Sequence, residues 1–243
     1  MIESALWGFV GGSALVLGGV LALVTSWSTR AIALVMAFGS GVLISAVSFD
    51  LVAEAWPESG GLVAGAALAG GALVFFAADL AISRTGLPRR RRATADHASA
   101  AAMVIVAGAV LDGIPESAAI GATLSGAGGV SATFVIAVFL SNIPESLSSS
   151  AGLRRTGRSG WAIVGLWLVI AVVSAVAAGL GYLLVTHSPP EVVGAIRGFA
   201  AGAVLTMVAS TMLPEAHDEG GPVTALVTTA GFLAAVALSG VPG

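Results

Sequence analysis

Long apolar runs alternate with short polar breaks along the whole chain. Each run is about 18–25 residues long, the length that an α-helix needs to cross a bilayer. The runs lack the ~10-residue alternation of apolar and polar positions that marks the strands of a membrane barrel. Since lipid offers backbone N–H and C=O groups no partner, a helix that pairs them internally fits best. The pattern predicts membrane-spanning helices at residues 3–26, 31–57, 60–84, 97–123, 129–152, 161–186, 191–215 and 222–241.

The breaks between the predicted helices contain the glycine, proline, serine and charged residues that are typical of turns. None of these breaks resembles a linker to a second domain. We therefore expect a single membrane domain over residues 1–243, folded as an all-α bundle of eight transmembrane helices.

Composition indicates a membrane protein and excludes a soluble fold. Of the 243 residues, 57% are hydrophobic and 9% are charged, whereas soluble domains carry about 25% charged residues. The chain has no cysteine, so disulfides and thiolate metal sites are excluded.

The basic residues, all of them arginine, lie almost entirely in alternate loops. Nine of the ten lie near the breaks after the first, third and fifth predicted helices, and Arg197 is the exception. By the positive-inside rule these loops face the cytoplasm, which places both termini outside a multi-pass protein of the cell membrane. The arginine run at 89–92 is explained as a topology anchor that also attracts anionic lipid, without a nucleic-acid partner.

Parts of the chain repeat in helices that cross the predicted membrane in opposite directions. The sequence Ile-Pro-Glu-Ser occurs at 114–117 and again at 143–146. Inverted repeats with a substrate site at their interface are typical of transporters. The alternative is that helices rich in glycine and alanine look alike by composition. A second repeat, in which all four positions share one offset, matches Phe199, Gly202, Glu215 and Ala216 with Phe38, Gly41, Glu54 and Ala55.

Carboxylates inside the predicted helices are the main functional signal. Asp112 and Glu116 lie in the middle of the fourth helix, and Glu145 lies deep in the fifth. Each ionised carboxylate at mid-bilayer costs roughly 2.5–3.5 kcal/mol, and no arginine lies at the same depth to neutralise them. A bound divalent cation removes this cost, so the pattern predicts a metal pathway. Protonated carboxyl groups that are hydrogen-bonded between helices are the alternative.

The spacing of neighbouring residues predicts a compact, oxygen-rich site. Asp112 and Glu116 are four residues apart and share one helix face. Pro115 and Pro144 each precede a glutamate, remove a helical hydrogen bond and so free a backbone carbonyl. Oxygen ligands suit Mg, Mn, Fe or Zn. The predicted metal ligands are Asp112, Glu116, Ser141, Asn142 and Glu145, with Asp50 on the second helix as a further candidate.

Other polar residues are secondary candidates. Asp50 and Glu54 share a face of the second helix, where they would form a site at the outer mouth. His217 is expected to be solvated, and with Glu215 it offers a weak exit site on the cytoplasmic side. The remaining interfacial residues are expected to be solvated or ion-paired: Asp79, His97 and His187.

With prolines before glutamates in the fourth and fifth of eight spans, both termini outside and inverted outer repeats, the chain resembles the ZIP metal transporters. The likeness covers essentially the whole chain, and its specific part is short, at 112–117 and 141–146. It implies a 3+2+3 helix arrangement and passage of a divalent metal toward the cytoplasm by an elevator-like or rocking movement. Zinc is the implied cargo, with Mn, Fe, Co or Cd as alternatives. The resemblance leaves open whether the protein forms a homodimer.

The chain departs from the pattern of that family at several ligand positions. Asp112 stands where histidine is usual, and Ser141 stands where histidine or glutamine is common. Asn142 fits the pattern, but Ser174 occupies the region where many relatives have a further acidic ligand. Fewer ligands and no histidine argue against a two-metal centre.

We therefore predict a non-enzymatic permease that imports a divalent metal and needs no prosthetic group. Glu116 and Glu145 are the expected central ligands, completed by Asp112 and Asn142. One alternative is a proton-coupled carrier of another solute. Another is an intramembrane protease that uses two carboxyl groups, although the chain lacks the Gly-x-Gly-Asp signature of such enzymes. A helical scaffold with protonated carboxyl groups is the third.

Overall fold

The computed structural model describes residues 1–84, 98–123 and 131–239. Helix accounts for 92% of the structure, and the described residues form no strand, which confirms the all-α class. Some predicted features lie outside the described residues, namely the arginine run at 89–92, His97 and the glycine-rich break at 125–129.

Seven helical stretches of the described chain are long and apolar enough to cross a membrane, as in a multi-pass membrane protein. The last predicted span corresponds to a shorter apolar helix of 17 residues. The elements are α1 (Ile2–Val24), α2 (Thr29–Ala46), the π-helix η1 (Val47–Val52), α3 (Ala53–Ser59), α4 (Gly61–Ser83), α5 (Ala98–Thr123), α6 (Ala132–Arg155), α7 (Gly160–Thr186), α8 (Pro190–Met207), the π-helix η3 (Val208–Met212), α9 (Leu213–Gly220) and α10 (Val223–Ser239).

Short polar signals start and end these helices. Ser28, Ser131 and Ser159 cap α2, α6 and α7, each accepting a hydrogen bond from the backbone N–H three residues later. α3 and α9 both end at a glycine of positive φ, 75° at Gly60 and 73° at Gly221. Glycine adopts this conformation without steric cost, so the chain can reverse sharply into α4 and α10.

Two spans change from α-helix to π-helix and back again. η1 interrupts the span 29–59 at Val47, and η3 interrupts the span 190–220 at Val208. The number of residues between Val47 and Val208 equals the number between Phe38 and Phe199, which are repeat counterparts in the sequence. π-turns are rare and frequently lie at functional sites. Their occurrence at one register indicates that the two spans are structural counterparts.

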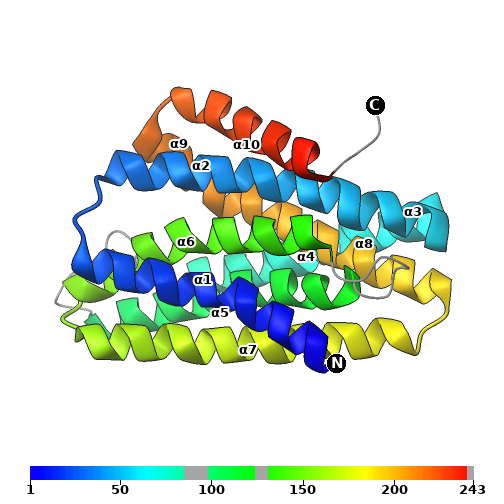
Figure 1. The fold of residues 1–243 in the computed structure, drawn as a ribbon, viewed down its shortest axis with the longest axis horizontal. Helices are drawn as coiled ribbons and strands as arrows, with labels where there is room; N and C mark the ends of the chain where they lie inside the picture. Colours follow the sequence, from blue (N-terminus) through cyan, green and yellow to red (C-terminus); the bar gives the residue numbers. More distant parts are fainter. Residues whose placement is uncertain (85–97, 124–130, 240–243) are drawn as a thin grey trace.

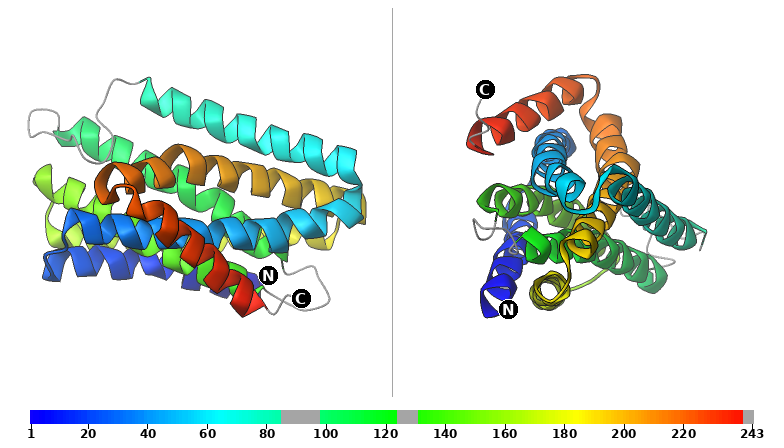
Figure 2. Two further views of the ribbon diagram at one scale, coloured as in Figure 1. Left: turned by 90° about the horizontal axis from the view of Figure 1, so that it is seen from above. Right: turned by 90° about the vertical axis from the view of Figure 1, so that its right-hand side faces the viewer.

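The two interrupted spans also pack against their neighbours in the same way. α2 lies along α10, and α8 lies along α4 (Figures 1 and 2). Gly41 on α2 and Gly202 on α8 approach the carbonyls of Thr228 and Leu68 so closely that a Cβ would overlap them. Close backbone contact at small residues is a usual mode of helix association in membranes.

α1, α5, α6 and α7 form another set of packed helices. α1 packs along α6 and α7, and α5 packs along α7. This set meets the interrupted spans where α2 contacts α6 and where α5 contacts α8. The helices that carry the predicted metal ligands therefore lie at the boundary between the two sets.

Burial separates central from peripheral helices. Within the most apolar 18-residue stretch of each helix, 67% of the residues are buried in α6 and 17% in α4. Large apolar side chains such as Leu62, Trp161 and Leu226 are exposed, as contact with lipid allows. α6 is thus an interior helix, although it is rich in serine and carries Asn142 and Glu145.

Candidate metal site

α5 and α6 place the three predicted carboxylates in the protein interior. Asp112, Glu116 and Glu145 are 3%, 1% and 3% exposed. The carboxyl groups of Asp112 and Glu145 lie close enough to Glu116 to interact with it electrostatically. Because like charges repel strongly where the dielectric constant is low, this group of side chains attracts a cation.

Ser141 and Asn142 add neutral groups next to these carboxylates. Ser141 Oγ lies 3.4 Å from Glu116 Oε1 and 3.0 Å from the carbonyl oxygen of Val138. Asn142 Nδ2 donates a hydrogen bond of 3.1 Å to the carbonyl oxygen of Gly11 on α1. That bond orients the amide and leaves its oxygen available for another partner.

Two buried oxygens of this site have no hydrogen-bond partner among the residues that the structure describes. They are Glu116 Oε2 and Asn142 Oδ1. Buried polar atoms in proteins are normally paired, and an unpaired one costs about 1–3 kcal/mol. Both atoms carry free lone pairs, so a divalent cation is a fitting partner for them.

The described side chains contain no ready-made cluster of three acidic or histidine residues around one metal position. A cation on α5 and α6 would therefore take a mixed set of ligands that includes amide or hydroxyl oxygens, or would draw the carboxylates closer. The structure does bring five of the predicted ligands into one region, Asp112, Glu116, Ser141, Asn142 and Glu145.

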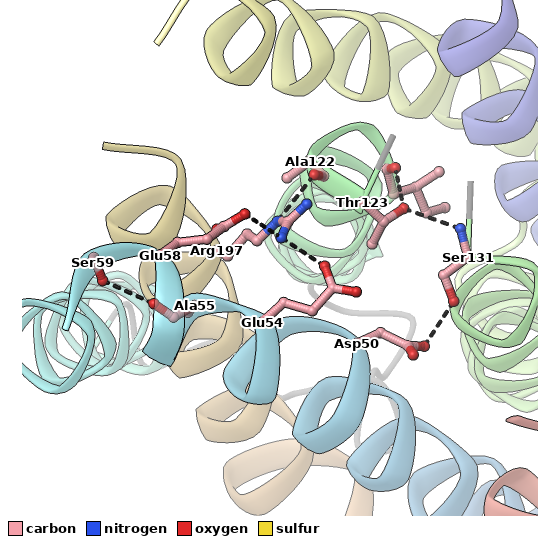
Figure 3. Close-up of polar contacts among 10 residues, drawn as sticks. Asp50, Glu54, Ala55, Glu58, Ser59, Ala122, Thr123, Ser131 and Arg197 are labelled. Atoms are coloured by element: carbon pink, nitrogen blue, oxygen red, sulfur yellow. Dashed lines mark hydrogen bonds and ion pairs between the residues drawn. The ribbon is translucent and has the colours of Figure 1, made fainter. Parts of the chain in front are cut away.

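Asp50, the sixth predicted ligand, has a different partner. It lies in η1, and its Oδ2 accepts a hydrogen bond of 2.8 Å from the hydroxyl of Ser131, the N-cap of α6 (Figure 3). The contacts described for Asp50 do not join it to Glu116 or Glu145. Its part in metal binding stays a prediction.

A buried arginine lies near Asp50, and the sequence alone indicates no role for it. Arg197 on α8 is 2% exposed, and its Nη1 lies 2.6 Å from Glu54 Oε2 and 2.8 Å from Glu58 Oε1 (Figure 3). We call Asp50, Glu54, Glu58 and Arg197 the Arg197 cluster. The spacing of four residues between the glutamates is the available signal in the sequence, but the predicted span ends at 57, whereas α3 continues through Glu58 to Ser59.

A second carboxylate contact lies toward the other end of α6. Glu215 on α9, the repeat counterpart of Glu54, accepts a hydrogen bond of 2.6 Å from the hydroxyl of Ser148. The neighbouring Ser149 Oγ is buried and has no partner within the described ranges. Hydroxyl groups therefore continue along α6 from Glu145 toward Glu215, while His217 is exposed.

Comparison with known proteins gives one distant similarity. No model of a known protein family matches the chain. A protein of Arabidopsis thaliana described as a "putative zinc transporter" is 27% identical to it over 186 residues. The aligned region covers 75% of this chain but 29% of that relative, so the chain spans less than a third of the relative's length.

Proposed function

We propose that this chain carries a divalent metal ion across the membrane, with zinc as the first candidate and Mn, Fe, Co or Cd as others. Glu116 and Glu145 are the central ligands, and Asp112, Asn142 and Ser141 complete the oxygen set. The observation that carries the proposal is the burial of three neighbouring carboxyl groups in spanning helices. In the same site, Glu116 Oε2 and Asn142 Oδ1 have no described hydrogen-bond partner.

The energy of the buried charges supports a cation as the missing component. A carboxylate at the centre of a bilayer is costly, and residues of this kind generally mark ion or substrate pathways. One divalent ion offsets the repulsion among the carboxylates and pairs with both free oxygens. The same ion can leave again, because the site lacks the thiolate and imidazole ligands that close a structural zinc site.

The repeat supports a specific arrangement of the spans and a direction. In this proposal the first three and last three spans form inverted triplets around α5 and α6, a 3+2+3 arrangement. The shared offset of η1 and η3 supports it. The arginine-rich loops face the cytoplasm and both termini lie outside, so import runs from the Arg197 cluster toward Glu215. The similarity to the Arabidopsis protein described as a "putative zinc transporter" supports zinc as the cargo.

Uptake of radioactive zinc into sealed vesicles that contain the purified protein tests this function. Glu116→Gln and Glu145→Gln keep the shape of each side chain but remove its charge, so each should lower initial uptake at least about tenfold, the effect of losing roughly 1.4 kcal/mol of binding. Glu191→Gln, at an exposed acid on α8, is the matched control and should retain wild-type uptake.

Thermal unfolding separates binding from transport. Zinc at 100 times its dissociation constant should stabilise the wild-type protein by about 2.7 kcal/mol, and the two glutamine variants should lose most of this gain. Wild-type uptake in both Glu116→Gln and Glu145→Gln would refute the proposal. Competition by Mn, Fe, Co and Cd in the same vesicles ranks the cargo.

A further inference from the structure

Arg197 occupies a position where an unpaired charge would be very costly. It is almost fully buried within the span Pro190–Gly220, and an intramembrane arginine is generally found with a compensating partner. Glu54 and Glu58 provide that compensation, with ion pairs of 2.6 and 2.8 Å from Nη1. Both glutamates lie on α3 and face α8 together, as Figure 3 shows. The pairs therefore bind the two interrupted spans to each other.

The same arginine also holds the end of α5. Its Nε donates a hydrogen bond of 3.3 Å to the carbonyl oxygen of Ala122, in the last turn of that helix. The last carbonyls of a helix have no partner within it, and the negative end of the helix dipole favours a cation there. Arg197 thus connects α3 and α8 with the helix that carries Glu116.

A chain of hydrogen bonds extends this connection to α6. The backbone N–H of Ser131 lies 3.5 Å from the hydroxyl of Thr123 at the end of α5. The Ser131 hydroxyl in turn donates to Asp50 in η1. Figure 3 shows these contacts around the ends of α5 and α6. At this end of the protein, the helices that carry the candidate metal site are tied to both interrupted spans.

The repeat in the sequence contains this arginine in one half only. Glu54 and Glu58 have acidic counterparts in the second half of the repeat, Glu215 and Glu219. At the same offset, the counterpart of Arg197 in the first half is Met36, a buried apolar residue of α2. The carboxylates are therefore common to both halves, but the arginine belongs to one of them.

We propose that Arg197, together with Glu54 and Glu58, is an ionic latch that keeps this end of the protein closed. Opening the route from this end to Glu116 and Glu145 requires Arg197 to leave the two glutamates and the Ala122 carbonyl. The latch rests on the proposed function for what passes through the opening. The test of the latch measures how fast a reagent reaches the site, not whether metal is carried. The latch and the proposed function can therefore fail separately.

Single-cysteine labelling tests the latch, because the natural chain has no cysteine. The reporter Ser141→Cys lies next to Glu116, where the wild-type side chain is buried. A membrane-impermeant maleimide is applied separately to each face of sealed vesicles. With the latch intact, labelling from the face of Arg197 should be slow. Replacement of Arg197 should raise that rate about tenfold, since the open form is then no longer a minor state.

Arg197→Met is the basic replacement, and two further variants show whether its effect comes from misfolding. Arg197→Met copies the residue of the repeat counterpart but leaves two glutamates unbalanced. The triple variant Arg197→Met, Glu54→Gln, Glu58→Gln removes all three charges together, so no unpaired charge remains, and removing both sides of an ion pair is often neutral for stability. Arg197→Lys keeps a cation and should keep labelling near the wild-type rate.

A second reporter distinguishes opening from general loosening. Ser149→Cys lies on α6 toward Glu215, and its labelling from the opposite face should not rise in the latch variants. Wild-type labelling of Ser141→Cys in a folded triple variant would overturn the latch. Equal increases at both reporters would also overturn it, because they would mean that the whole bundle had loosened. Unchanged zinc uptake in the Glu116 and Glu145 variants would instead remove the proposed function and leave the latch standing.

Discussion

At the scale of single residues, the buried polar atoms of this protein differ in whether protein groups satisfy them. Arg197 has two carboxylates and a backbone carbonyl as partners. Glu116 Oε2 and Asn142 Oδ1 are buried without a described hydrogen-bond partner. A charge paired with groups on several helices stabilises one arrangement of those helices, whereas a buried oxygen without a partner is ready to bind something else. The first pattern suits a latch and the second suits a binding site.

Asn142 provides a residue-scale test of the ligand set. Asn142→Leu removes the amide oxygen and should raise the dissociation constant for zinc about 10–100-fold, as expected when a charged partner loses one polar contact. Asn142→Asp keeps an oxygen and adds negative charge, so it should bind zinc at least as tightly as the wild type. Zinc-dependent thermal stabilisation measures both.

The control for this series is Ser13→Ala on α1, whose hydroxyl donates to the Val10 carbonyl of its own helix. It should bind zinc like the wild type. Unchanged zinc affinity in a folded Asn142→Leu protein would remove Asn142 from the site.

At the scale of helices, two devices recur in both halves of the chain. One is the π-helical segment in the middle of a span. The other is the glycine at which two backbones touch, Gly41 against α10 and Gly202 against α4. Both devices set how the interrupted spans lie against their neighbours.

Overpacking one of these contacts should weaken the fold. Gly202→Val places a side chain against the Leu68 carbonyl, where a Cβ already overlaps, and should lower the free energy of unfolding by about 1–3 kcal/mol. Gly65→Val introduces the same residue on α4 where a Cβ meets nothing within 4 Å. Thermal unfolding in detergent compares the two, and equal stability of both variants would show that the α4–α8 contact is not tight.

At the scale of the whole molecule, the protein is a bundle of two helix sets with different polar contacts at its two ends. One end carries the Arg197 cluster, and the other carries the Ser148–Glu215 hydrogen bond. Alternate opening of the two ends would require these contacts to break in turn. Hydrogen bonds and ion pairs to charged groups are the stronger polar contacts in proteins, so breaking the Arg197 contacts is a substantial part of opening that end.

The proposed orientation has its own test at this scale. His187 and Ser26 are both exposed. His187 directly follows α7 and Ser26 lies two residues after α1, and Figure 1 shows the last turns of these two helices at opposite ends of the bundle. In intact cells, an impermeant maleimide should label His187→Cys at once, because positive-inside topology places it outside. Ser26→Cys should react only after the membrane is permeabilised. The reverse pattern would invert the proposed direction of transport.

Local features of the sequence were sufficient for the all-α class and for the bounds of several helices. The predicted span 3–26 is α1, Ile2–Val24, and 161–186 is α7, Gly160–Thr186, because apolar run length and serine caps act within a few residues. The shared face of Asp112 and Glu116 follows from helix geometry alone.

Contacts between distant segments depended on the packing of the whole chain. The Arg197–Glu58 pair joins residues 139 positions apart, and nothing in either local sequence specifies the other. The partner of Asp50, Ser131, is likewise distant in the sequence. The positions of the two π-helical segments also cannot be predicted from their local sequence. Hydropathy and spacing describe what one helix needs from its surroundings, whereas a partner is chosen by how complete helices fit together.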